Sequence, residues 1–332
     1  MNHTPFRTIL VNEKEENQFE RDVVKRAISD LPEGEVLIHV QYSSLNYKDE
    51  LSATGNKGVT RKYPHTPGID AAGEVISSEN PSLKKGDQVI VTGYDLGMNT
   101  SGGFGEYICV PADWVVPLPV GMSLKESMMY GTAGFTAALS VYKLMEAGIF
   151  SNMGRILVTG ATGGVGSVAV SILAKLGYDV VGVTGKIEEK DMLLSLGAKE
   201  VIQREEMNDR SGRPMLKGIY AGVIDTVGGN ILASALKVVR YGGCVTTCGN
   251  VAGHELQTTV FPFILRGISL LGIDSVQCPM DVRRKVWVLL ANEWKNLELL
   301  SYTAECTLEE LNEKFELILQ GKLKGRTVIN MK

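Results

Sequence analysis

A glycine-rich stretch at residues 158–167 constrains the fold more than any other part of this chain. It follows a strand-like run at 155–159 and precedes a helix-like run at 168–177. In that context Gly163 lets the backbone approach a pyrophosphate, Gly166 lets the helix pack close to its strand, and the helix N-terminus offers free N–H groups to phosphate. Ala161 stands where the usual six-residue pattern has its first glycine, so a glycine-rich turn without a ligand is the alternative interpretation.

The next strand–helix unit indicates which dinucleotide such a turn would bind. A strand-like run at 178–183 is followed by Thr184, Gly185 and Lys186, and Arg204 comes just after a further strand-like run. NAD-binding folds usually place an Asp or Glu at this strand tip to bind the ribose 2′-hydroxyl. A hydroxyl and a cation suit a 2′-phosphate instead, so the pattern predicts NADPH. The alternative is that Lys186 and Arg204 are ordinary solvated charges.

The pattern of the chain changes near residue 125. Residues 1–124 alternate short β-patterned runs with turn residues, which favours a compact, barrel-like domain. Residues 125–297 alternate strand-like and helix-like runs, as in a parallel sheet covered by helices. Residues 298–332 contain a helix pattern and a short strand pattern, and we expect this segment to return to the first domain.

Composition excludes several classes of function. The formal net charge of −4 provides no basic surface typical of nucleic-acid binding. No apolar run predicts a membrane span, and the first residues lack the layout of a signal peptide. The five cysteines are scattered and form no Cys-x-x-Cys pair, so neither a disulfide framework nor a zinc ribbon is predicted. We therefore expect a cytoplasmic protein.

Several motifs occur along the chain in a characteristic order. They are Pro67–Val75, Gly86–Val89, Gly102–Tyr107, the glycine-rich turn and Asp225–Gly229. In this order they resemble the medium-chain dehydrogenase/reductase superfamily over essentially the whole chain. Closer similarity to its YhdH/YhfP-type group of quinone oxidoreductases and acrylyl-CoA reductases lies in Ser44–Asp49, Val183–Lys186, Arg240–Cys244 and Pro262–Val276. The resemblance implies an α/β fold, in which a Rossmann doubly wound parallel sheet domain joins a GroES-like β-barrel catalytic domain.

The residues that hold zinc in metal-dependent relatives are missing. Asn46 stands where they carry a ligating Cys, Gly68-Ile69-Asp70 replaces their Gly-His-Glu, and Ala133 lies near their third ligand. Zinc needs three or four thiolate, imidazole or carboxylate ligands, so we expect no metal. Alcohol oxidation relies on such a Lewis acid to stabilise the alkoxide. A cleft without zinc better suits reduction of a carbon–carbon double bond that a carbonyl or thioester activates.

In that reaction a nicotinamide delivers hydride to the β-carbon, and donors must stabilise charge on the enolate oxygen. Tyr47 and Asn46 are the predicted catalytic residues, as hydroxyl and amide donors. The resemblance also implies a cofactor contact for Tyr47, which makes a proton-donor role weaker. Asp70 is predicted to anchor its own loop through backbone N–H groups.

The resemblance implies the remaining contacts to NADPH. The pyrophosphate would lie on Thr162, Gly163, Gly164, Val165 and Gly166, the 2′-phosphate on Thr184, Gly185, Lys186 and Arg204, and the nicotinamide near Asn250, Ile264 and Ser275. Related proteins pair the strand equivalent to 268–273 across a two-fold axis, so a homodimer is expected. The predicted function is NADPH-dependent reduction of an α,β-unsaturated acyl-CoA or small enone, with no nucleic-acid or membrane partner. The alternatives are an NADPH:quinone oxidoreductase and a non-catalytic NADPH-binding regulator.

Overall fold

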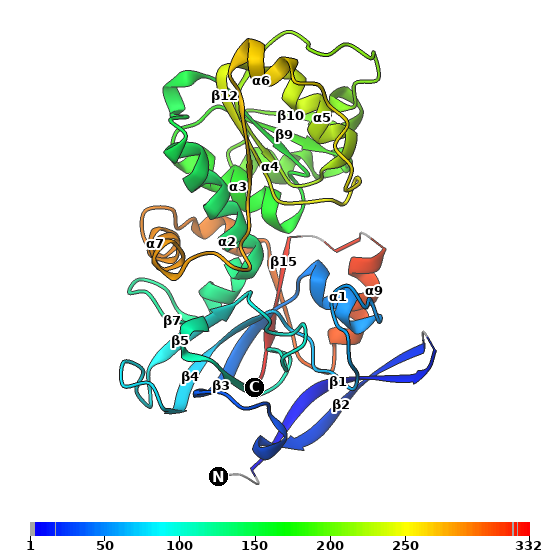
Figure 1. Ribbon diagram of the computed structural model, residues 1–332. Helices are drawn as coiled ribbons and strands as arrows, with labels where there is room; N and C mark the ends of the chain where they lie inside the picture. The colour runs from blue at the N-terminus through cyan, green and yellow to red at the C-terminus, as the bar shows by residue number, and fades with distance from the viewer. Residues whose placement is uncertain (1–3, 17, 321, 324) are drawn as a thin grey trace. The chain divides into compact units, whose positions relative to one another are not determined.

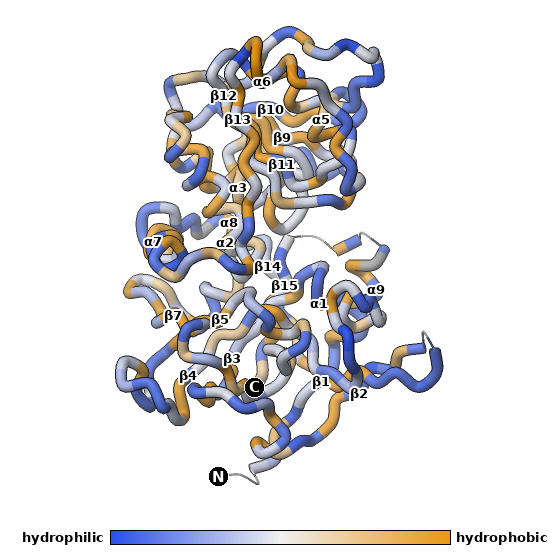
Figure 2. The backbone as a smooth tube through the Cα atoms, in the orientation of Figure 1, coloured by the Kyte–Doolittle hydropathy of each residue, from blue (hydrophilic) through white to orange (hydrophobic). Residues whose placement is uncertain are grey.

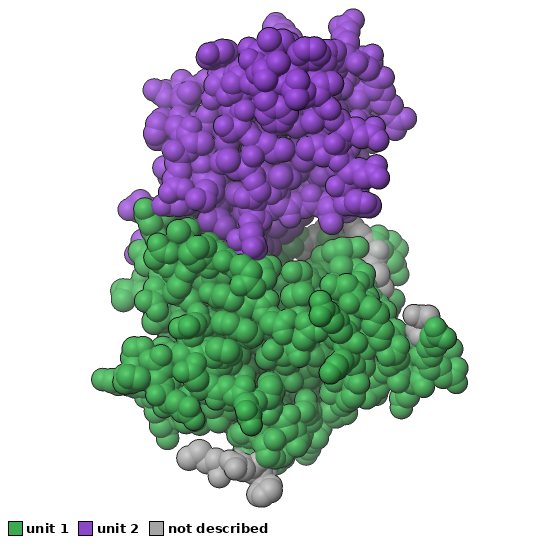
Figure 3. All heavy atoms as spheres, viewed as in Figure 1, with its two compact units in different colours: residues 1–132, 276–291, 302–332 green, residues 133–275, 292–301 purple. Residues whose placement is uncertain are grey.

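The computed structural model (Figure 1) describes residues 4–16, 18–320, 322–323 and 325–332. The chain forms two compact units, which are composed of several segments each. Unit 1 comprises residues 1–132, 276–291 and 302–332, and unit 2 comprises residues 133–275 and 292–301 (Figure 3). These ranges differ from the expected domains, because residues 125–132 and 276–291 belong to unit 1 and residues 298–301 belong to unit 2.

Unit 2 is built on a six-stranded parallel sheet. Across the sheet the strands are β10 (Glu200–Gln203), β9 (Val180–Thr184), β8 (Ile156–Thr159), β11 (Tyr220–Asp225), β12 (Val239–Thr247) and β13 (Ser269–Gly272). All neighbouring pairs are parallel. Counted from β8, this is the 3-2-1-4-5-6 order of the Rossmann fold. The expected fold of the dinucleotide domain is therefore confirmed.

The central strands of this sheet consist of apolar residues and glycine up to their last residues, which are Thr159, Thr184 and Asp225. Every residue of β8, β9 and β11 is buried, as expected for parallel strands that are covered on both faces. Figure 2 shows these strands largely in the hydrophobic colours. The helices that follow the strands are α3 (Gly164–Lys175), α4 (Lys190–Ser195), α5 (Gly229–Val238) and α6 (Phe261–Arg266), and unit 2 also contains α8 (Leu297–Ser301). Its short 3₁₀ helices are η3 (Ser151–Met153), η4 (Ile187–Glu189) and η5 (Arg204–Met207).

Unit 1 is built on a seven-stranded sheet. Its main path runs β14 (Thr303–Cys306), β15 (Arg326–Asn330), β3 (Val36–Ser44), β4 (Asp70–Ser78), β5 (Gln88–Thr92) and β7 (Val115–Pro117), and β6 (Tyr107–Val110) pairs with β3. Only the β14–β15 pair is parallel among these pairings. The late strand β15 thus lies in the interior of the sheet, between β14 and β3.

Further elements of unit 1 surround this sheet. Strands β1 (Pro5–Glu15) and β2 (Gln18–Ala27) pair as a separate antiparallel hairpin. The helices are α1 (Tyr47–Ala53), α7 (Met280–Ala291) and α9 (Leu311–Leu319), with the 3₁₀ helices η1 (Ile28–Asp30) and η2 (Ala112–Trp114). Across the described residues, no helix is both long enough and apolar enough to span a bilayer.

A buried arginine explains why residues 276–291 belong to unit 1. Arg283 of α7 is fully buried and donates hydrogen bonds to the carbonyl oxygen of Thr92, at 2.9 Å, and to that of Val276, at 3.0 Å. Its guanidinium also lies 4.6 Å from the ring centroid of Tyr94. Because a buried guanidinium must keep its hydrogen bonds, α7 is held against the end of β5.

Helix α2 (Leu124–Glu146) is interrupted at Gly131, whose backbone has φ 52° and ψ −158°. A Cβ atom at this position would overlap the side chains of Ser44, Asp70 and Arg326. Only glycine combines this left-handed φ with so close an approach. The break therefore brings the backbone of α2 against the polar groups described next.

Candidate functional site

The first candidate site lies in unit 1, where β3 ends and α1 begins. Asn46 precedes the helix and Tyr47 is its first residue, with a side chain that is 52% exposed. Asp49, which is fully buried, accepts hydrogen bonds from the backbone N–H groups of Asn46 and Ile69, both at 2.8 Å. The start of α1 is thereby fixed to the loop that leads into β4.

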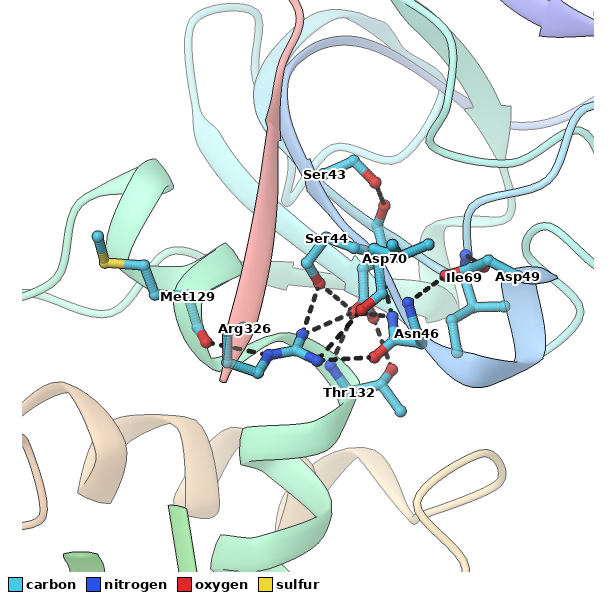
Figure 4. A network of polar contacts seen from close by, with 10 residues as sticks. Ser43, Ser44, Asn46, Asp49, Ile69, Asp70, Met129, Thr132 and Arg326 are labelled. Atoms are coloured by element: carbon cyan, nitrogen blue, oxygen red, sulfur yellow. Dashed lines mark hydrogen bonds and ion pairs between the residues drawn. The ribbon is translucent and has the colours of Figure 1, made fainter. Parts of the chain in front are cut away.

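Asp70 is the centre of a buried polar network that includes Asn46, the residue before α1 (Figure 4). It is the first residue of β4 and is fully buried. Its Oδ2 accepts hydrogen bonds from Ser44 Oγ at 2.5 Å, Asn46 Nδ2 at 2.7 Å and Thr132 N at 2.9 Å, and its Oδ1 accepts one from Thr132 Oγ1 at 2.5 Å. The carboxylate joins β3, β4 and the broken helix α2. The predicted anchoring of its own loop through backbone N–H groups is wrong, because these four donors come from other segments and three of them are side-chain groups.

Arg326, the first residue of β15, completes this network. Its guanidinium is 5% exposed and donates to Ser44 Oγ at 2.9 Å and to Asn46 Oδ1 at 3.2 Å. It also donates to the carbonyl oxygens of Leu45 and Met129 and lies 4.0 Å from Asp70 Oδ2. Burial lowers the pKa of Arg326, and the carboxylates of Asp70 and Asp49 oppose this shift.

This geometry bears on the predicted catalytic pair. Asn46 Nδ2 donates one hydrogen bond to Asp70 and another, at 3.1 Å, to the carbonyl oxygen of Ser44. Both amide hydrogens are therefore used within the protein, and the amide oxygen accepts from Arg326. Asn46 has no hydrogen left for a substrate oxygen, so the structure offers no support for it as a donor. Tyr47 keeps a half-exposed side chain at the same helix start.

The second candidate site is the carboxyl edge of the sheet in unit 2. Gly163 directly precedes α3, and the first-turn N–H groups of Gly164, Val165 and Gly166 have no acceptor within the helix. A Cβ atom on Gly166 would overlap the carbonyl oxygen of Gly160, which explains the need for glycine there. The Thr162 and Thr184 hydroxyl oxygens lie 2.9 Å apart and join this turn to the tip of β9.

The residues predicted to hold a 2′-phosphate lie together at that strand tip. Thr184 ends β9, and its hydroxyl oxygen accepts a hydrogen bond from the backbone N–H of Lys186 at 2.9 Å. The guanidinium of Arg204 lies close to Gly185, since a Cβ atom added there would be 3.1 Å from the guanidinium carbon. Arg204 is also 3.7 Å from Glu205, in an exposed pair that contributes little to stability.

The predicted nicotinamide contacts are less tightly grouped. Asn250 lines a hollow of about 570 Å³ at the carboxyl ends of β12 and β13, together with Thr247, Cys248, Gly249, Gly272, Ile273 and Asp274. Ile264 is on α6 and is 68% exposed, and Ser275 is the last residue of its segment of unit 2. Neither of these two residues lines the hollow.

Comparison with known proteins decides the family. Residues 32–120 match the family model of the alcohol dehydrogenase GroES-like domain, and residues 164–292 match that of the zinc-binding dehydrogenase. The chain is 51% identical over 303 residues to YhfP of Bacillus subtilis, which carries the name of a quinone oxidoreductase, and this match covers 91% of the chain and 92% of YhfP. It is 44% identical over 327 residues to the acrylyl-CoA reductase AcuI of Ruegeria pomeroyi, covering 98% of the chain and 99% of AcuI.

This chain belongs to the medium-chain dehydrogenase/reductase superfamily. Its fold matches the crystal structure of the YhdH oxidoreductase from Salmonella enterica in complex with NADP, with a TM-score of 0.95 and 41% identity. That match covers 98% of this chain and 100% of the other. The structure of Bacillus subtilis YhfP with NAD bound gives a TM-score of 0.96 at 48% identity and covers 99% and 100% of the two chains. The resemblance to the YhdH/YhfP-type group is confirmed.

Many medium-chain dehydrogenases bind zinc, so we tested whether the residues of this chain suit the metal. The carboxylate of Asp70 accepts four hydrogen bonds from protein donors and faces the guanidinium of Arg326. Its neighbour Asn46 has its amide engaged with the same groups. Within the described ranges, no group of three or more His, Cys, Asp or Glu side chains could hold a metal ion. These residues do not fit a zinc site.

Several site residues were not predicted from the sequence. Asp49, Thr132 and Arg326 were missed in unit 1, because their role depends on contacts between segments far apart in the chain. Asp225 of β11 was noticed only as part of a motif. A usable signal was present for it: a carboxylate at the carboxyl end of a wholly apolar strand requires buried donors.

Proposed function

We propose that this protein is an NADPH-dependent reductase that transfers hydride to the β-carbon of an α,β-unsaturated acyl-CoA thioester or a small enone. The observation that carries this proposal is the grouping of Thr184, Gly185, Lys186 and Arg204 at the tip of β9, where the strand ends in a threonine and not in the Asp or Glu that binds a free 2′-hydroxyl. The 44% identity to an acrylyl-CoA reductase over nearly the whole chain supports the substrate class.

In this proposal the two units contribute different parts. NADPH supplies the hydride when it is bound. The start of α3 binds the pyrophosphate through backbone N–H groups, and Lys186 and Arg204 bind the 2′-phosphate. Tyr47 contacts the cofactor or orients the substrate carbonyl with its hydroxyl. Asn46 acts as a positioning residue, because Asp70 and Arg326 hold it and thereby hold the start of α1.

The proposal is tested with purified protein, NADPH and acryloyl-CoA, with the product identified by mass spectrometry. We expect the saturated propanoyl-CoA in step with NADPH consumption. If NADPH is consumed only with quinones and no saturated thioester forms, the protein is a quinone reductase and the proposal is wrong. Binding of NADPH without turnover of any enone, quinone or acyl-CoA would replace it by a non-catalytic regulator.

We also propose that the protein forms a homodimer through the edge of the unit 2 sheet. Strand β13 ends the sheet and leaves one edge without a neighbouring strand among the described residues. Next to it in sequence, the side chains of Val260, Phe261, Ile264 and Leu265 are each at least 43% exposed. An apolar surface beside a free strand edge favours pairing with a second copy.

The five cysteines are all free thiols, which suits the reducing cytoplasm where we place the protein. The substrate is a small molecule, with no nucleic-acid or membrane partner.

A further inference from the structure

The carboxylate of Asp225 joins the ends of three neighbouring strands in unit 2. Asp225 ends β11 and is fully buried. Its Oδ1 accepts a hydrogen bond from Thr159 Oγ1 at the end of β8, at 2.7 Å, and its Oδ2 accepts one from Thr247 Oγ1 at the end of β12, at 2.9 Å. The backbone N–H of Gly228 donates to the same Oδ2 at 3.0 Å. Burial raises the pKa of Asp225, and these donors oppose the shift by stabilising the charged form.

The Thr159 side of this network leads directly to the glycine-rich turn. Thr226, next to Asp225, donates its hydroxyl to the Thr159 carbonyl oxygen at 2.8 Å, and its backbone N–H to Thr159 Oγ1 at 3.0 Å. A Cβ atom on Gly160 would overlap Thr226 Oγ1, so the turn rests on this residue. The Gly160 carbonyl in turn contacts Gly166 at the start of α3. Residues 225–226 therefore contact the pyrophosphate-binding turn and fix its position.

The Thr247 side leads to the loop at residues 247–250, which lines the hollow at the end of β12. The backbone N–H of Cys248 donates to the Asp225 carbonyl oxygen at 3.0 Å. A Cβ atom on Gly249 would overlap the Thr226 carbonyl oxygen, so this loop rests on the same residue as the glycine-rich turn. In a Rossmann fold the two halves of a dinucleotide lie over the two halves of the sheet. The 247–250 loop therefore lies on the half that takes the nicotinamide.

We propose that Asp225 is a positioning residue for the dinucleotide: it fixes the spacing between the pyrophosphate-binding turn and the 247–250 loop, so that one cofactor engages both. This inference rests on the proposed NADPH-dependent function. It assigns separate effects to the two threonines, because each donates to a different oxygen of one carboxylate. Loss of the Thr159 hydroxyl should disturb the pyrophosphate end, and loss of the Thr247 hydroxyl should disturb only the nicotinamide end.

The test compares two ligands, NADPH and 2′-phospho-ADP-ribose, which lacks the nicotinamide ring. Dissociation constants are measured by calorimetry for the wild type, Thr159→Val, Thr247→Val and Asp225→Asn. We expect Thr247→Val to weaken NADPH about tenfold and to leave 2′-phospho-ADP-ribose unchanged. We expect Thr159→Val to weaken both ligands about tenfold. Asp225→Asn should weaken NADPH more than it weakens the fragment.

Thr246→Val is the matched control, because Thr246 is a buried threonine of the same strand whose hydroxyl donates to the Val223 carbonyl oxygen instead, at 3.4 Å. It should change neither dissociation constant. If Asp225→Asn does not fold, the two threonine variants decide the question. The inference would be overturned if Thr247→Val weakened both ligands equally, or if neither threonine variant weakened either ligand. In both cases NADPH binding by the wild type would leave the proposed function unaffected. Absence of NADPH binding by the wild type would overturn both.

Discussion

Two buried carboxylates, Asp49 and Asp70, act electrostatically on the guanidinium of Arg326 in unit 1, and Asp70 also lies 4.0 Å from it. Burial raises the pKa of Asp49 to about 7, and the charge of Asp70 adds to the shift. An unfolded chain would ionise Asp49 near its ordinary value of 3.8. Between these two values the folded state holds a proton that the unfolded state has released. The free energy of unfolding contributed by Asp49 therefore falls as pH rises through this window and is level above it.

Asp49→Asn tests this pH dependence. The variant cannot ionise at position 49, so the excess stability of the wild type over the variant should shrink by about 2 kcal/mol between pH 5 and pH 7.5. Urea unfolding at several pH values measures the difference. Asp113→Asn, at an exposed residue of η2, controls for the loss of any carboxylate. A difference that stays constant between these pH values would show that Asp49 is already ionised in the folded protein at pH 5.

Lys186→Ala tests the cofactor preference. A charge-assisted hydrogen bond contributes about 1.5–3 kcal/mol, so its loss should weaken NADPH about 10- to 100-fold. NADH, which has no 2′-phosphate, should be nearly unaffected. Titration of both nucleotides measures this, and Lys190→Ala, at an exposed lysine on α4, is the control. Equal affinity of the wild type for NADH and NADPH would contradict the interpretation of this strand tip.

The sequence predicted candidate residues whose place in the fold follows from the local chain. It missed residues whose contacts lie in distant segments. Gly163, Gly166 and Lys186 were predicted because a strand–turn–helix pattern places each of them without further information. Arg326 was missed because nothing near it in sequence indicates that it meets Ser44, Asn46 and Asp70. Asn46 was predicted as a free donor because the partners that use its two hydrogens lie in other segments.

At the scale of elements, the break in α2 depends on one residue. Gly131→Ala places a Cβ on a residue with a left-handed backbone, which alanine adopts only at a cost. The added Cβ also overlaps three side chains of the Asp70 network. We expect a loss of about 3 kcal/mol or more in stability, measured by urea unfolding. Gly148→Ala is the matched control, since Gly148 has φ 82° but nothing within 4 Å of the added Cβ. It should cost only the backbone strain of about 1–2 kcal/mol. Similar losses of stability in both variants would show that the Asp70 network can rearrange around the added Cβ at little cost.

The strands of unit 2 were predicted within a few residues, but the start of α3 was not. The helix-like run in the sequence begins at Val168, whereas α3 begins four residues earlier, at Gly164. The three residues Gly164, Val165 and Gly166 open the helix although glycine disfavours helices. Packing against the Gly160 carbonyl outweighs that preference, and local propensity cannot show it. The β1–β2 hairpin was not singled out, because the sequence between its two strands contains neither glycine nor proline.

At the scale of the whole molecule, the free edge of β13 predicts the oligomeric state. Light scattering at micromolar concentration should give twice the 36.0 kDa mass of one chain. Leu265→Asp places a charge on the exposed apolar surface of α6 and should shift the mass toward that of the monomer. Leu194→Asp, at an exposed leucine of α4, should leave the mass unchanged. A monomeric wild type would contradict the proposed dimer.

The interior position of β15 has a consequence for biosynthesis. Every segment of unit 2 has been synthesised once residue 301 has been added, whereas the unit 1 sheet still lacks β14 and β15 at that stage. Domains usually fold in the order of synthesis, but here the unit that begins first must be completed last. Until residues 326–330 arrive, strand β3 presents an unfilled edge and Asp70 is without the guanidinium of Arg326. The edge of β3 in unit 1 therefore stays unpaired until the last strands are made, at a stage when the whole chain of unit 2 has already been synthesised.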